Sequence, residues 1–201
     1  RRRRRFGGND DIPKVRFDPQ KVGELELSWW KAHNDGQNGE GKEKLIIFLT
    51  KWIEELYGLG RYEAENAVKF LTKGVGYHDK RDWGKAVGIV THFYRLIKQK
   101  TNFLFDPKVA AQLEVNWWQI HDELENTQDK GKLEKAFQDL YGEIYRLSDF
   151  QVFKAAHLKA LATAAHDLAE KAVLRKEQEG YWNQTRDYLV KSYFALKEVA
   201  S

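Results

Sequence analysis

The chain contains an internal repeat, and this repeat restricts its fold more than any other feature. Residues 17–79 align with residues 105–167 without a gap, and 18 of these 63 positions are identical. A match of this length is typical of a protein built from two copies of one supersecondary unit, so we interpret the chain as a tandem duplication. The identical positions of the first copy are Phe17, Asp18, Pro19, Leu25, Glu26, Trp29, Trp30, His33, Asn38, Lys42, Lys44, Leu45, Glu55, Tyr57, Leu59, Ala67, His78 and Asp79.

After residue 79 the offset between the copies changes from 88 to 99, so the second copy carries 11 extra residues. Eleven residues make about three helical turns, and an insertion of that length lengthens a helix pair without rotating its apolar faces. We therefore expect a taller final helical hairpin in the second copy. The residues Trp83, Tyr94 and Lys98 of the first copy then match Trp182, Tyr193 and Lys197.

Each copy begins with a helix-start signal. Asp18 is a good N-cap, Pro19 suits the first helical position, and Phe17 can pack on Val22 as a hydrophobic staple. The second copy repeats the pattern from residue 105 onward.

Apolar periodicity and turn signals predict an all-α fold, a tandem duplication of a four-helix unit. The copies could form two helical bundles or one layered helical stack. We expect a basic disordered arm at 1–16, a first four-helix repeat at 17–100, and a second repeat with a longer final hairpin at 105–199. The expected helices are about 19–33, 42–57, 62–77, 82–99, 107–124, 131–147, 149–178 and 181–199.

Composition excludes several classes of protein. The net charge is +4, but five arginines at the start supply +5, so the rest of the chain sums to −1 and is no polyanion binder by charge alone. There is no Cys, which excludes disulfides and zinc–thiolate sites, and no apolar run long enough for a transmembrane span. We expect an intracellular protein. The Arg-rich start without Met also fits the remains of a mitochondrial targeting segment, and a tag or an incomplete sequence explains it equally well.

One set of repeated polar residues has the side chains of a metal site. Imidazole and carboxylate are ligands for zinc, iron or manganese, and helices can bring them together. Two arguments oppose this: the Glu-x-x-His spacing of di-iron bundles is absent, and neighbouring His and Asp on a helix point about 100° apart. In the alternative interpretation, His33 and His121 simply form hydrogen bonds at the edge of an apolar face. The candidate ligands are Glu26, His33, His78 and Asp79, with Glu114, His121, His166 and Asp167 in the second copy.

Three other groups are candidates for interactions. Trp30 and Trp118 should lie at the margin of their helices, where they could form an aromatic platform, or else pack between helices. Arg175 and Lys176 should lie on the projecting hairpin. The arm could contact phosphates of nucleic acid or anionic lipid, and the simpler interpretation is a solvated tail. Its basic residues are Arg1, Arg2, Arg3, Arg4 and Arg5.

The sequence has no nucleotide-binding glycine loop, serine nucleophile elbow or zinc-protease motif. We therefore expect a non-catalytic helical interaction protein, a structural subunit or adaptor whose partners are other protein subunits, with no cofactor. The first alternative is a metal- or cofactor-binding helical bundle that uses the repeated His, Glu and Asp. The second is a nucleic-acid or acidic-membrane binder that acts through the arm.

Overall fold

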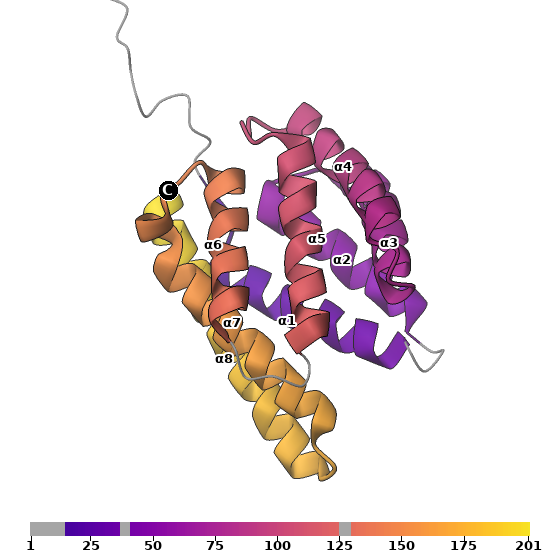
Figure 1. The fold of residues 1–201 in the computed structure, drawn as a ribbon, viewed down its shortest axis with the longest axis vertical. Coiled ribbons are helices and arrows are strands. Elements are labelled where there is room, and N and C mark those ends of the chain that lie inside the picture. Colours follow the sequence, from indigo (N-terminus) through magenta and orange to yellow (C-terminus); the bar gives the residue numbers. More distant parts are fainter. Residues whose placement is uncertain (1–14, 37–40, 125–129) are drawn as a thin grey trace, which may run out of the picture.

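The part of the chain that the structure describes is helical and has no strand. The computed structural model describes residues 15–36, 41–124 and 130–201, and Arg1 to Arg5 lie outside these ranges. Eight helices run through the described residues, so the prediction of an all-α fold is confirmed (Figure 1). They are α1 (Pro19–Gly36), α2 (Lys42–Tyr57), α3 (Arg61–Asp79), α4 (Trp83–Lys100), α5 (Pro107–Leu124), α6 (Lys130–Tyr145), α7 (Asp149–Lys171) and α8 (Arg175–Ala200).

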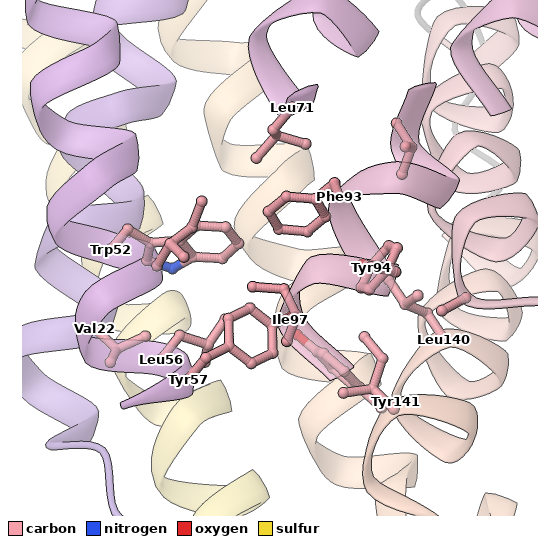
Figure 2. Close-up of a cluster of buried hydrophobic side chains, with 14 of the residues drawn as sticks. Val22, Trp52, Leu56, Tyr57, Leu71, Phe93, Tyr94, Ile97, Leu140 and Tyr141 are labelled. Carbon is pink, nitrogen blue, oxygen red and sulfur yellow. The ribbon is translucent and has the colours of Figure 1, made fainter. Parts of the chain in front are cut away.

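The helices form a closed cycle of neighbours. Each helix packs against the next along the chain, and α8 packs back against α1. One hydrophobic core takes side chains from both copies, from Val22 of α1 to Leu196 of α8. Figure 2 shows part of this core, where Trp52 of α2, Phe93 of α4 and Tyr141 of α6 converge. The copies therefore share one core instead of burying their apolar faces separately.

The start of each copy follows the predicted capping pattern. Asp18 Oδ1 accepts a hydrogen bond from the backbone N–H of Gln20 at 3.0 Å, and Asp106 Oδ1 accepts one from Lys108 at 2.9 Å. The N–H of each capping residue donates to a glutamate of the next helix, Glu55 at 3.0 Å in the first copy and its equivalent at 2.9 Å in the second. This contact gives a physical reason for the repeated glutamate, because it ties the start of one helix to its neighbour.

The final hairpin is longer in the second copy. Helices α7 and α8 have 23 and 26 residues, against 19 and 18 for α3 and α4, and their joined ends project from the other helices (Figure 1). The prediction that the third helix continues to residue 178 is wrong, because α7 ends at Lys171 and Gly180 lies inside α8. A glycine inside a helix costs only about 1 kcal/mol, so it need not stop one. Arg175 and Lys176 begin α8 at the tip of this hairpin.

The described chain begins close to where it ends. Val15, assigned above to the arm, is instead buried, and its N–H donates to the carbonyl oxygen of Ala200 at 3.3 Å.

None of the described helices combines the length and apolarity needed to cross a membrane.

Candidate metal centre

Two groups of side chains, one in each copy, place metal-binding atoms close together. Within each group one atom from every side chain lies within 4.8 Å of the others. In each copy the first histidine comes from the first helix, and the neighbouring His and Asp come from the third helix. We call them the first triad, which is His33, His78 and Asp79, and the second triad, which is His121, His166 and Asp167.

In the first triad one carboxylate oxygen faces two imidazoles. Asp79 Oδ1 lies 3.5 Å from His33 Nε2 and 3.0 Å from His78 Nδ1. The objection that adjacent His and Asp cannot face one point is therefore wrong. Their Cβ atoms do diverge around the helix, but the side chains are long enough to turn back towards each other.

The second triad repeats this arrangement with the same atoms. Asp167 Oδ1 lies 2.8 Å from His121 Nε2 and 3.2 Å from His166 Nδ1. The second site is less exposed, because the side chain of Asp167 is 23% accessible and that of Asp79 is 45% accessible. The duplication has thus kept the geometry as well as the residue types.

A further carboxylate orients one histidine of each triad. His78 Nε2 lies 3.1 Å from Asp122 Oδ1, and His166 Nε2 lies 2.9 Å from Glu170 Oε1. These outer carboxylates, Asp122 and Glu170, do not occupy equivalent positions, since Asp122 aligns with Asn34 and Glu170 lies beyond the aligned stretch 105–167. The copies therefore obtain the same contact from different places in the chain.

Tryptophans from both copies surround the oriented histidines. The ring centroid of His78 lies 5.5 Å from that of Trp83 in its own copy and 5.6 Å from that of Trp118 in the other. In the reciprocal arrangement, the His166 ring lies 5.4 Å from Trp182 and 5.2 Å from Trp30. The repeated tryptophans thus help to fix the imidazoles in place.

Trp30 and Trp118 do not lie at the margin of their helices as predicted. They are only 5% and 6% exposed, whereas Trp29 and Trp117 are partly exposed. The second tryptophan of each pair is buried because it packs against a histidine of the other copy, Trp30 against His166 and Trp118 against His78.

Both triads border one cavity. It has a volume of about 140 Å³, and its walls include the four triad histidines and both tryptophan pairs. We call it the triad cavity. It is large enough for several water molecules or a small molecule next to both triads. Its other lining residues are Val75, Asp122, Thr163 and Glu170.

The electrostatics of the triads follow from their carboxylates. Burial acts to lower the pKa of His78 and His166, but the hydrogen bonds to their flanking carboxylates outweigh it and raise each pKa to about 9. Burial acts in the opposite direction on Asp79 and Asp167, and the neighbouring imidazoles hold the pKa of each well below its usual range. His33 Nε2 is buried and completes no hydrogen bond among the described residues.

The two candidate glutamates do not join the triads. Glu26 accepts hydrogen bonds from Lys159 Nζ and, at 2.8 Å, from the hydroxyl of Tyr193. Glu114 accepts from the hydroxyl of Tyr94 at 3.3 Å and from the indole N–H of Trp117 at 3.2 Å. Both border a second, interior cavity of about 40 Å³, so the predicted ligand set divides between two places.

Each interior glutamate accepts a hydrogen bond from a tyrosine of the other copy. Glu26 of the first copy meets Tyr193 of the second, and Glu114 of the second copy meets Tyr94 of the first. Only Glu26 has a hydrogen-bonded cationic partner, because Leu71 occupies the first-copy position that aligns with Lys159. Burial raises the pKa of Glu114 to about 7.

The repeat comparison could not identify three of these residues. Asp122 aligns with Asn34 and Glu170 lies beyond the aligned stretch 105–167, so the repeat does not distinguish either residue from other surface acids. The sequence does mark Lys159, because it lies in the mostly apolar stretch 155–160 and aligns with a leucine of the first copy.

No family model, curated protein or solved structure matches the chain. The function of the triads therefore has to be inferred from their own geometry.

Proposed function

We propose that the protein binds two divalent transition-metal ions, one at each triad. Each ion would be held by two imidazole nitrogens and one carboxylate, with the remaining positions open towards the triad cavity. The observation that carries the proposal is the recurrence of the complete arrangement in both copies, with the outer carboxylate supplied from non-equivalent positions. Shared ancestry alone does not account for that contact.

The residues present fit such an ion. Imidazole with carboxylate suits zinc, iron(II) and manganese. Histidines that bind metals commonly direct their second nitrogen at a carboxylate, which is the contact made by Asp122 and Glu170. A bound ion would also give the buried His33 Nε2 a partner, and it would supply Lewis acidity to a small molecule in the cavity.

The alternative is a network of ion pairs without metal. It accounts for the raised pKa of His78 and His166, whose two ring nitrogens both face carboxylates. It leaves the buried His33 Nε2 with only a 3.5 Å contact to Asp79 Oδ1 that does not complete a hydrogen bond. A metal ion would give that nitrogen a partner, and it would bind in competition with the protons that the flanking carboxylates favour.

Metal titration of the full chain tests the proposal. Protein stripped with a chelator would be titrated with Co²⁺ and Zn²⁺, with visible absorption and elemental analysis as readouts. The unchanged chain should bind two ions, His121→Ala should bind one, and the double variant His33→Ala/His121→Ala should bind neither with micromolar affinity.

The other two of the six histidines provide matched controls. His92 and His157 lie outside both triads, so His92→Ala and His157→Ala should leave two ions bound. The proposal fails if the unchanged chain binds no ion, or if the double variant still binds two.

The proposal concerns binding, and the expected lack of catalysis stays a prediction. The expected role as a subunit or adaptor also stays a prediction, and a separate surface bears on it below. Binding of nucleic acid or anionic lipid through Arg1 to Arg5 stays a prediction too, because those residues lie outside the described ranges.

A further inference from the structure

A long groove runs between α2 and α3, away from the triads. Its volume is about 1020 Å³, and we call it the α2–α3 groove. Its apolar lining comes from Ile46 and Ile47 of α2, Val68 and Phe70 of α3, and Leu96 of α4. The polar residues that line it are Thr50, Lys51, Arg61, Glu65, Asn66, Lys69, Thr72 and Lys73.

Two isoleucines of the apolar lining are exposed to solvent. Ile46 is 45% exposed and Ile47 is 51% exposed, one beside the other on the same helix. Contiguous apolar surface with a polar border commonly marks a binding site, because covering it removes apolar area from water. Covering these isoleucines with the apolar side chains of a ligand would therefore be favourable.

The charge around the groove is mostly positive. Lys51, Lys69 and Lys73 form no ion pair among the described residues, Arg61 pairs with Glu54, and Glu65 is the only acidic residue of the lining. From residue 61 to residue 73 the helix rises about 18 Å. The basic side chains are thus distributed along the groove and come from both helices that border it.

The second copy shows that the fold does not require this groove. Glu134, Lys135 and Asp139 occupy the positions of Ile46, Ile47 and Lys51. There, ion pairs link α6 to α7, from Lys135 to Asp149 at 3.4 Å and from His157 to Glu134 at 3.0 Å. The α6 positions are therefore polar and paired with α7, whereas the same positions of α2 carry two isoleucines and a lysine that is unpaired among the described residues.

We infer that the α2–α3 groove binds an amphipathic helix of a partner protein, with an apolar stripe against Ile46, Ile47 and Phe70 and acidic residues on its flanks. A helix laid between two helices buries its apolar face in the mode seen for many helix-in-groove complexes. A fatty acid or single lipid headgroup needs a cation at one end only. Positive charge spread along the length of the groove instead complements a row of carboxylates.

Binding of designed peptides to the full chain tests this inference. The probe is a fluorescein-labelled 18-residue helical peptide, a length of about five turns, with leucines on one face and glutamates on its flanks. Its counterparts carry lysines in place of the glutamates, or the same residues in scrambled order. The acidic amphipathic peptide should bind at least tenfold more tightly than either counterpart in fluorescence anisotropy.

Variants of the groove should remove this preference. The triple variant Lys51→Glu/Lys69→Glu/Lys73→Glu and the single variant Ile47→Asp should each weaken binding of the acidic peptide at least tenfold. The matched control is Lys132→Glu/Lys154→Glu/Lys191→Glu, which makes the same charge change at exposed positions of the second copy. Every variant keeps the Arg1 to Arg5 arm, so attraction of the acidic peptide to the arm cancels in the comparison, and circular dichroism checks that each variant is folded.

A crosslinking experiment then addresses the natural occupant. A photoreactive residue at position 47 should crosslink to a peptide with acidic residues and apolar positions three and four apart, and the same residue at position 135 should not. Equal binding of the acidic peptide by the triple groove variant and by its matched control would overturn the inference. Lysine-dependent binding of phosphatidylglycerol vesicles without peptide binding would overturn it as well. Because the groove is separate from the triads, the result should be the same with chelated and metal-loaded protein.

Discussion

The two copies agree at their triads and differ at their interior glutamates. Each triad brings the same three atoms together at similar distances, although the outer carboxylates come from different positions. By contrast, Glu26 is bonded to Lys159, while Glu114 has only the neutral donors of Tyr94 and Trp117. The triad geometry is thus the same in both copies despite different supporting residues, whereas only one of the two interior glutamates has a hydrogen-bonded cation.

Removing Lys159, the cation bonded to Glu26, should have the largest effect on stability. Lys159→Leu, which installs the residue found at the equivalent position of the first copy, would leave Glu26 buried without its cation. Breaking one side of a buried ion pair typically costs about 3–5 kcal/mol. We expect a loss of that size in the free energy of unfolding, measured by guanidinium denaturation at pH 8.

Two further variants separate the charge effect from lost packing. The double variant Glu26→Gln/Lys159→Leu should recover much of the loss, because it leaves no buried charge behind. Glu114→Gln should not destabilise the protein at pH 8. Burial raises the pKa of Glu114 to about 7 from an ordinary 4.5. The protein with Glu114 therefore becomes less stable as pH rises from 4.5 to 7, and the protein with a neutral amide at this position does not. A single variant of Lys159 that loses less than about 1 kcal/mol would contradict the account of a buried pair.

The metal-free protein should lose stability at alkaline pH. The pKa of His78 and His166 is raised from 6.5 to about 9 in the folded state, so their contribution is fully present below pH 6.5 and is lost as pH rises through about 9. The loss should be at most about 3 kcal/mol for each imidazole. Denaturation of chelated protein between pH 6 and pH 9 measures it.

The two triads can be tested separately in the same assay. His166→Gln should remove its share of the alkaline loss, and His92→Gln should not change it. The stability of the metal-loaded protein should instead increase with pH, because metal binding needs neutral imidazoles and therefore strengthens as pH rises. A free energy of unfolding that stays constant from pH 6 to pH 9 in the chelated protein would contradict the proposed ion pairs.

Changes of the outer carboxylates should have the smallest effect and should act on one triad each. Asp122→Asn should weaken metal binding at the first triad, and Glu170→Gln should weaken it at the second, each by about 10–100-fold. Competition titrations with a chromophoric chelator measure the two affinities. The nearby Glu123→Gln is the control, because Glu123 contacts Gln119 and belongs to neither triad. Equal loss at both triads in either variant would show that the carboxylates do not act locally.

Local signals in the sequence predicted much of the fold. The bounds of α2 and α5 match the expected ranges, since each begins and ends at strong local signals such as Pro107 and Gly58. The repeat also identified every triad residue. The turn after Lys171, the contact of α8 with α1 and the outer carboxylates were beyond reach, because each depends on which helices meet in space. The pairing of Lys159 with Glu26 spans 133 positions, and no periodicity connects them.

The reciprocal contacts across the duplication also bear on its origin. Glu26 meets Tyr193 while Glu114 meets Tyr94, so each half completes the interior of the other. Contacts exchanged in this way are those of an isologous interface between identical subunits. The tyrosine donor to each glutamate therefore always comes from the other half of the chain. The present chain thus has the form of a pseudo-symmetric homodimer within one polypeptide, whose two halves differ in groove, hairpin and buried charge.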